Sequence, residues 1–226
     1  AEESYQAGLE AAKDENFQDA TRFFENVRTK YPFSAYAALS ELRLADLKYQ
    51  QGRYVEAAEA YAQFVKLRPA HEERDYAEFR IGLAHLKDAP DDFALFPPAH
   101  EKDQRAVEKA VAALRSFVES RPDSKYAPEA KKLLTEAEGR LVSHEWYVAE
   151  FYMKRKRWAG AAGRLEALVT KYPGSRREAE ALLLLARAYS ELDEKLRARN
   201  ALQQLIVKHP QDPRRPEAER LLATLR

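Results

Sequence analysis

The feature that most constrains this chain is a set of five prolines that share one pattern in the residues before them. Each proline follows a bulky or basic residue, giving Tyr31-Pro32, Arg68-Pro69, Arg121-Pro122, Tyr172-Pro173 and His209-Pro210. Twelve residues before each proline stands an alanine: Ala20, Ala57, Ala110, Ala161 and Ala198. Eight before it stands a large apolar or aromatic residue (Phe24, Tyr61, Leu114, Leu165, Leu202), and five before it stands another (Val27, Phe64, Phe117, Leu168, Leu205). One structural unit is therefore repeated along the chain.

The spacing inside each unit indicates a helix that ends just before the proline. The three marked positions follow one another at steps of four and three, so their side chains share one face of a helix. The small residue lets a neighbouring helix approach, and the large ones fill the groove beside it. A period of about 34 residues with these offsets is the tetratricopeptide pattern. The first repeat shows it most plainly, with Gly8, Ala20, Phe24 and Pro32.

The predicted fold is therefore all-α, a tetratricopeptide-repeat solenoid of five helical hairpins plus a C-terminal capping helix. Residues 1–122 are expected to hold repeats 1–3. Residues 123–226 are expected to hold a long linking helix, repeats 4 and 5 and the capping helix, in one continuous solenoid. The linking helix is expected over 126–155, as one helix or as two with a kink near Gly139. The other expected helices are 5–14, 18–30, 37–50, 54–66, 76–86, 103–120, the one that ends before Tyr172, 176–192, 195–208 and 213–226.

The third repeat contains an insertion over residues 87–102. Pro69 and Pro122 are 53 residues apart, whereas Pro32 and Pro69 are 37 apart, so about sixteen residues are added. Insertions in solenoids map to loops on one face, which is often a binding face. The alternative is an insertion that is merely tolerated. Three apolar residues make it more apolar than a solvated loop requires: Phe93, Leu95 and Phe96.

Composition and motifs exclude several classes of function. Lys and Arg number 38 and Asp and Glu 37, so the net charge is +1, which argues against a nucleic-acid binder. There is no cysteine, which removes disulfides, thiol catalysis and cysteine-based zinc sites. The histidines share no ligand spacing, so neither a metal nor another cofactor is predicted. Glu119-Ser120 resembles the acid-serine pair of lytic enzymes built on helical solenoids, but no glycine-rich segment follows it, and no enzyme activity is predicted. The start at Ala1-Glu2-Glu3, without methionine, is expected to reflect trimming.

Two groups of residues are candidates for binding partners. Aromatic residues around the first repeat either pack between adjacent repeats or grip a peptide in the concave groove of the solenoid. The predicted substrate-peptide groove consists of Tyr5, Tyr31, Phe33, Tyr36 and Tyr61. The basic run Lys154-Arg155-Lys156-Arg157 is either a solvated turn or a contact for an acidic protein surface or for lipid head groups.

The features added to the repeats resemble those of the BamD family, the outer-membrane lipoproteins of the bacterial β-barrel assembly machinery. The family has a Tyr-x-Val-Ala-Glu-Tyr-Tyr run, then a short turn with a tryptophan, then a helix that ends in Tyr-Pro. Here Trp146 to Tyr152 resemble the run, with Phe151 at the first of the paired tyrosines, and Trp158 and Tyr172-Pro173 follow. The resemblance also covers Tyr31-Pro32-Phe33, the insertion and the long linking helix.

The resemblance implies a non-enzymatic scaffold at the periplasmic face of the bacterial outer membrane. Family members are tethered by a lipidated N-terminal cysteine, which this chain lacks, so an anchor is expected to lie upstream. They bind the POTRA domains of the barrel-forming subunit through the C-terminal repeats, and incoming unfolded outer-membrane proteins through the N-terminal repeats. Accessory assembly lipoproteins are further implied partners.

One arginine is implied to carry the POTRA contact. In the family, an arginine on the second helix of the fourth repeat pairs with an acidic residue of the last POTRA domain, and Arg164 stands at that position. The expected partner-binding residues are Arg164, Phe151, Tyr152 and Trp158. The plainer interpretation of Arg164 is an exposed helix charge. Two alternative functions are another periplasmic repeat scaffold, of the Tol-Pal or cell-division type, and a cytoplasmic peptide-binding adaptor.

Overall fold

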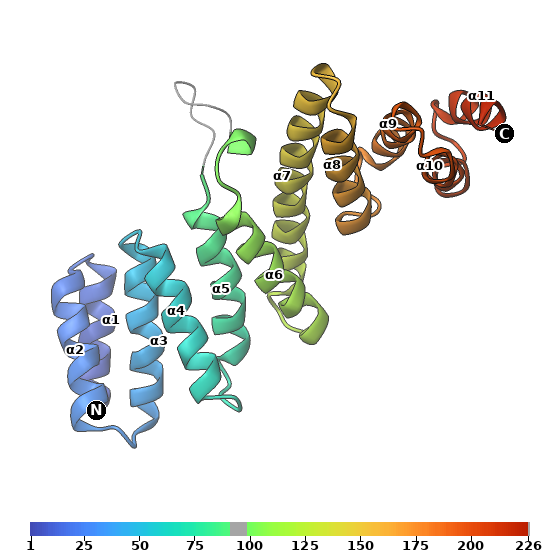
Figure 1. Ribbon diagram of the computed structural model, residues 1–226. Coiled ribbons are helices and arrows are strands. Elements are labelled where there is room, and N and C mark those ends of the chain that lie inside the picture. Colours follow the sequence, from blue (N-terminus) through green and yellow to red (C-terminus); the bar gives the residue numbers. More distant parts are fainter. Residues whose placement is uncertain (91–98, 226) are drawn as a thin grey trace. The chain divides into compact units, whose positions relative to one another are not determined.

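A computed structural model describes residues 1–90 and 99–225 of the protein, and across these residues the structure is helical, without a strand (Figure 1). The helices are α1 (Glu2–Lys13), α2 (Phe17–Lys30), α3 (Ala35–Gln50), α4 (Tyr54–Leu67), α5 (Arg74–Asp88), the 3₁₀ turn η1 (Ala99–Glu101), α6 (Arg105–Ser120), α7 (Ala127–Lys154), α8 (Trp158–Lys171), α9 (Glu178–Glu191), α10 (Lys195–Lys208) and α11 (Arg215–Thr224). The predicted all-α class is confirmed. Phe93, Leu95 and Phe96 of the insertion lie outside the described residues.

The fifteen marked positions form the core, as the repeat pattern predicts. Each of them is at most 2% exposed. They lie on α2, α4, α6, α8 and α10, the helices that precede the five prolines. Glycines on the preceding helices meet them closely, since a Cβ built on Gly8 would lie 2.7 Å from Cε1 of Phe24. The small and large positions therefore serve helix packing within each hairpin.

The prolines end these helices in one shared conformation. The residue before each proline has φ between −125° and −132° and ψ between 53° and 60°, which lies outside the α region that a following proline disfavours. A turn follows in each case, in which the carbonyl of the residue before the proline accepts from the amide three residues further on, for example from Ser34 N to Tyr31 O at 3.0 Å. Each proline thus both stops a helix and starts the turn to the next.

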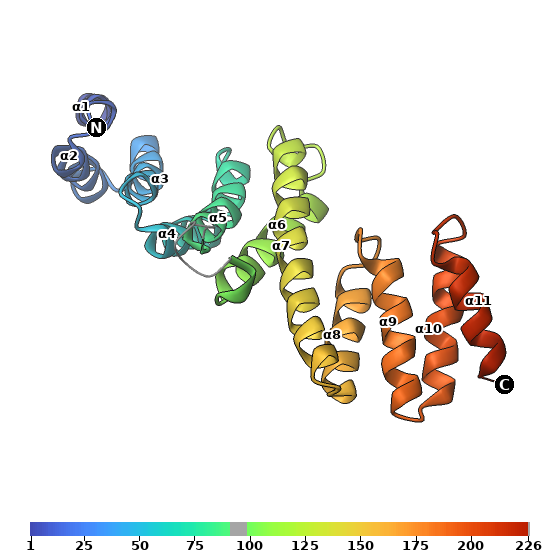
Figure 2. The same ribbon diagram turned by 90° about the horizontal axis from the view of Figure 1, so that it is seen from above.

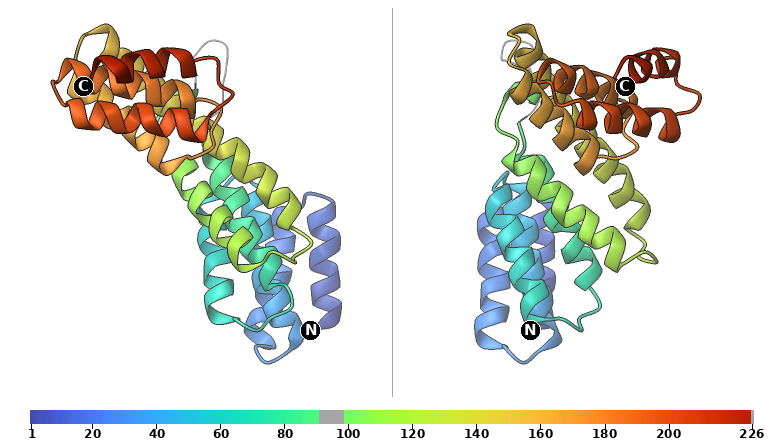
Figure 3. Two further views of the ribbon diagram at one scale, coloured as in Figure 1. Left: turned by 90° about the vertical axis from the view of Figure 1, so that its right-hand side faces the viewer. Right: turned by 45° about the vertical axis from the view of Figure 1, so that its right-hand side comes forward.

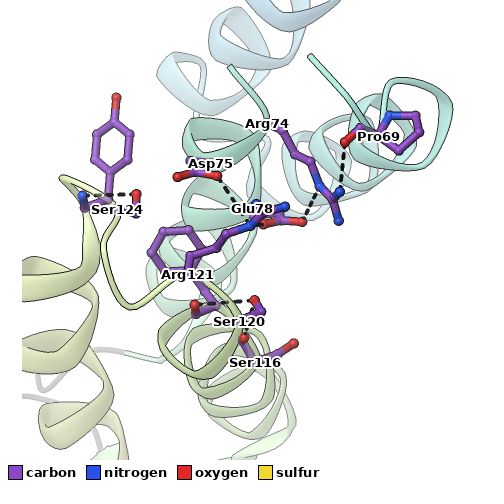
Figure 4. Close-up of polar contacts among 10 residues, drawn as sticks. Pro69, Arg74, Asp75, Glu78, Ser116, Ser120, Arg121 and Ser124 are labelled. Atoms are coloured by element: carbon purple, nitrogen blue, oxygen red, sulfur yellow. Dashed lines mark hydrogen bonds and ion pairs between the residues drawn. The ribbon is translucent and has the colours of Figure 1, made fainter. Parts of the chain in front are cut away.

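The basic residues before the prolines are held by acidic residues of the preceding helix. The guanidinium of Arg121 contacts Glu78 Oε2 at 3.0 Å and Asp75 Oδ1 at 3.4 Å through its Nε (Figure 4). Glu78 also accepts from Arg74 Nε at 2.7 Å, and Arg74 NH1 donates to the carbonyl of Pro69 at 2.8 Å. This carboxylate therefore links the turns on both sides of the third repeat.

The opposite ends of the hairpins use left-handed residues. Glu15, Gly52, Lys156 and Asp193 have φ of 58°, 75°, 54° and 59° and occupy equivalent positions in four hairpin turns. In each turn the next amide donates to a carbonyl five residues back, as in Arg53 N to Lys48 O at 2.9 Å, which is the Schellman arrangement.

The contacts divide the chain into two compact units. Unit 1 consists of residues 1–90 and 103–137, and unit 2 of residues 91–102 and 138–226. In unit 1, α1 to α6 lie side by side in chain order (Figures 1 and 2). In unit 2, α8 to α11 do the same, and the C-terminus lies on α11 beside α10 (Figure 3). α7 is one continuous helix through the boundary between Ala137 and Glu138. The predicted division at residue 122 and the count of five repeats stay predictions.

The capping helix closes the core of unit 2. Ala218 of α11 is fully buried, and Leu221, Leu222 and Leu225 pack against the same cluster as α9 and α10. In the described ranges 1–90 and 99–225, no helix is both long and apolar enough to cross a lipid bilayer.

Candidate functional site

A polar and aromatic cleft of about 670 Å³ lies on unit 1, and it is the first candidate site. Its walls come mainly from α1, α3 and α5, with one residue from α2. The lining residues are Tyr5, Leu9, Ala12, Lys13, Phe24, Arg43, Asp46, Leu47, Tyr49, Gln50, Tyr76 and Arg80. The lining includes three cationic side chains and one carboxylate, so the cleft favours an anionic or aromatic ligand.

Asp46 is the centre of the polar network in this cleft. Its Oδ1 accepts from the hydroxyls of Tyr61 at 2.5 Å and Tyr76 at 2.7 Å, and its Oδ2 accepts from Arg43 NH1 at 2.5 Å. The side chain is only 13% exposed, so these donors replace water. Burial, followed by the charge of Asp46, raises the pKa of both tyrosines, which therefore remain protonated donors.

Arg80 lies among three tyrosine rings. Its guanidinium carbon is 3.9 Å from the ring centroid of Tyr49 and 5.5 Å from those of Tyr61 and Tyr76, and its Nε donates to the Tyr61 hydroxyl at 3.1 Å. Its side chain is 16% exposed. Its NH2 also lies 3.9 Å from Asp46 Oδ1, so this one carboxylate is shared between Arg80 and Arg43 and leaves a net positive charge for an anionic ligand.

The structure brings two of the five predicted groove residues together. The rings of Tyr5 and Tyr36 have centroids 5.4 Å apart, and the Tyr5 hydroxyl accepts from Arg43 Nε at 3.3 Å. A hydrogen bond with Glu2 raises the pKa of Tyr36. Tyr61 has no exposed surface, and it joins the network through its hydroxyl on Asp46 and its ring beside Arg80.

The other two predicted groove residues lie in the turn between α2 and α3. Tyr31 is 44% exposed and Phe33 is fully exposed. Neither lines the cleft described above.

Sequence reasoning missed most of the polar residues of the cleft. Arg43, Asp46 and Tyr49 follow one another at steps of three on α3, and Tyr76 and Arg80 are four apart on α5. A polar stripe at helical spacing on helices that carry none of the marked positions was the available signal.

The second candidate site is the partner-binding face of unit 2. Arg164 of α8 is 44% exposed, and its NH1 contacts Glu145 Oε2 of α7 at 3.2 Å. Tyr152 packs against the backbone of α8, since a Cβ built on Gly160 would lie 2.8 Å from Cδ1 of its ring. Phe151 is 41% exposed, and Trp158, the first residue of α8, is partly buried.

Nothing in the described part of the chain indicates catalytic chemistry. No cluster of three or more metal-ligating side chains occurs among residues 1–90 and 99–225. The hydroxyl of Ser120, from the Glu119-Ser120 pair, donates to the carbonyl of Ser116 at 2.7 Å within α6 (Figure 4). A hydroxyl used in this way caps its own helix.

The fold defines a helical-repeat protein, and two candidate binding sites lie on it. The model of the YfiO family, described as an outer membrane lipoprotein, matches residues 1–222, and the chain belongs to this family. The resemblance to the BamD family is thereby confirmed.

Individual relatives support the same assignment. The chain is 28% identical over 205 residues to the outer membrane protein assembly factor BamD of Xylella fastidiosa, covering 89% of this chain and 70% of the relative. It is 27% identical over 220 residues to BamD of Neisseria gonorrhoeae, covering 94% and 80%. Since these relatives are named assembly factors, the prediction of a non-enzymatic protein is confirmed.

Solved structures of repeat proteins are similar to this chain at lower sequence identity. The TPR2AB domain of yeast Sti1 in its complex with pHSP90 has 16% identity and a TM-score of 0.45, covering 99% of this chain and 82% of that one. A putative kinesin light chain with TPR-like repeats, from Podosopora anserina, has 17% identity and a TM-score of 0.43, covering 91% and 92%.

Proposed function

We propose that this protein is a scaffold in the assembly of outer-membrane proteins, associated with the periplasmic face of the outer membrane. The observation that carries the proposal is membership of the YfiO family, whose curated relatives are named outer membrane protein assembly factors. Anchoring by an N-terminal lipid and contact with accessory assembly lipoproteins belong to the proposal.

In the proposed function, unit 1 receives unfolded outer-membrane proteins in its cleft. A helical-repeat groove with tyrosine faces and arginines can bind an extended polypeptide by stacking and by hydrogen bonds to carbonyls and carboxylates. The excess of cations in the lining supports this ligand class, because Lys13, Arg43 and Arg80 face only Asp46. Phe33 is a proposed extension of the groove at its rim.

The test of the cleft uses Lys13→Glu, because Lys13 is exposed and takes no part in the buried network. A labelled peptide from the C-terminal strand of an outer-membrane protein is titrated, and fluorescence anisotropy gives Kd. Reversing one surface charge is expected to weaken binding about fivefold. Lys30→Glu is the matched control, since Lys30 is an exposed lysine outside the cleft. Equal effects of the two variants would remove the cleft from the proposal.

Unit 2 is proposed to bind the POTRA domains of the barrel-forming subunit through Arg164, Phe151, Tyr152 and Trp158. The charge of Arg164 supports this, but Glu145 already holds it at 3.2 Å. An acidic partner residue must therefore compete with Glu145 or share the guanidinium, which has five donors.

Because two carboxylates would compete for Arg164, substitutions of Arg164 and of Glu145 are expected to change POTRA binding in opposite directions. Arg164→Glu is expected to weaken binding of purified POTRA domains at least about tenfold. Glu145→Gln frees Arg164 and is expected to strengthen the same binding. Lys171→Glu, an exposed charge on the same helix, is the control. If the wild-type protein is folded and does not bind the domains, the POTRA part of the proposal is wrong, and a generic periplasmic repeat scaffold becomes the better description.

A further inference from the structure

The turn between α7 and α8 carries a concentration of positive charge that the other hairpin turns lack. Lys154, Arg155, Lys156 and Arg157 are consecutive, and all four are exposed. The equivalent turns read Asp14-Glu15-Asn16, Gln51-Gly52-Arg53 and Leu192-Asp193-Glu194. Two of these are acidic, so the repeat itself does not require a basic turn.

Within the described residues 1–90 and 99–225, no carboxylate forms an ion pair with any of these four cations. This holds for Glu150, one turn before Lys154 on α7. By contrast, Arg53 in the equivalent turn of the second repeat is held by two hydrogen bonds to Glu56. The four like charges of the turn therefore form a local positive potential that can attract an acidic surface.

One of the cations is fixed over an exposed aromatic ring. The guanidinium carbon of Arg155 lies 3.6 Å from the ring centroid of Phe151, and its NH1 donates to the Phe151 carbonyl at 3.4 Å. Phe151 is 41% exposed, so the pair presents a flat apolar face beside a rigid cation. Arginine and aromatic residues are the types enriched at protein interfaces, and a preordered pair loses less entropy on binding.

We infer that the turn Lys154–Arg157, with the Arg155–Phe151 pair, is a docking element for an acidic surface on the protein partner of unit 2. The inference rests on the proposed function, because it extends the face that includes Arg164. Arg164 is already paired with Glu145, whereas the turn offers cations without an internal counter-charge. The turn therefore supplies the long-range attraction, and its effect is on the association rate.

The experiment measures association and dissociation rates of the POTRA domains at low and at high ionic strength. The test variant is Lys154→Gln/Arg155→Gln/Arg157→Gln, which leaves the backbone at Lys156 unchanged. The control is Lys30→Gln/Lys66→Gln/Lys131→Gln, which removes the same net charge from three exposed positions in unit 1. Anionic vesicles of phosphatidylglycerol are titrated with the same three proteins.

The test variant is expected to lower the association rate about tenfold at low ionic strength and to flatten its salt dependence, with dissociation changed less than about twofold. The control is expected to behave like the wild type. An unchanged association rate in the test variant, with the wild type binding normally, overturns the inference and leaves the proposed function intact. Loss of vesicle binding without any change in POTRA binding also overturns it. Absence of binding by the wild type overturns the proposed function and this inference together.

Discussion

Gly82 is the position where the helix packing can be tested most sharply. This glycine of α5 is buried, and a Cβ built on it would lie 2.6 Å from Cγ and 2.7 Å from Cδ2 of Leu114. Leu114 of α6 has no exposed surface, and its backbone nitrogen is 3.4 Å from the same point. The leucine therefore cannot swing away into solvent, and α5 and α6 must separate to admit the methyl group.

The magnitude follows from comparing Gly82→Ala with Gly163→Ala. Both replace a glycine inside a helix, which by itself stabilises the helix by about 1 kcal/mol. Gly163 of α8 is exposed and has no heavy atom within 4 Å of its Cβ position, so this gain is all that is expected there. Gly82→Ala adds overpacking, which costs about 1–3 kcal/mol. Because the helix contribution is the same in both, the changes in opening free energy caused by the two substitutions are expected to differ by about 1–3 kcal/mol.

Native-state hydrogen exchange is the appropriate assay, since it reports opening of each helix separately in a repeat protein. Gly82→Ala is expected to lower the opening free energy of α5 and α6, and Gly163→Ala to raise that of α8. If Gly82→Ala stabilises α5 and α6 as much as Gly163→Ala stabilises α8, Leu114 yields freely and the close-packing argument is wrong.

Three further predictions concern stability. Glu15→Gly is expected to raise the free energy of unfolding by about 0.5–1 kcal/mol, measured by urea denaturation, because φ is 58° there. Burial raises the pKa of Tyr189 to about 12 from 10.0, so the folded protein keeps a proton that the unfolded chain loses, and stability is expected to fall between these pH values. Tyr189→Phe should lessen that fall in Tm, and an unchanged slope would contradict the assignment. Burial, followed by the charge of Lys109, lowers the pKa of His85, so stability is lost as the pH falls below 6.5. His85→Gln should retain more of its Tm on acidification than the wild type does.

The sequence allowed the helical framework to be predicted because the framework depends on local spacing. A proline stops a helix that reaches it from the N-terminal side, and an alanine and two large residues at fixed offsets before it mark one buried face. A left-handed helix end, as at Gly52, is a local property of the same kind. Helix ends differed by a few residues, as in α1, which begins at Glu2 where Tyr5 was expected. Terminal turns carry little periodic signal.

The network of the cleft was not predictable in this way, because it depends on distances between helices. Asp46 meets Tyr61 and Tyr76 across separations of 15 and 30 residues, and repeat offsets describe only which side chains are buried. The pairing of Arg164 with Glu145 is of the same kind, with 19 residues between the partners. Family resemblance identified Arg164 as a binding charge, but only the structure shows that this charge already has a partner. Among the described residues, the four exposed cations of the α7–α8 turn form no ion pair with a carboxylate, which is why they, and not Arg164 alone, should determine how fast an acidic partner associates.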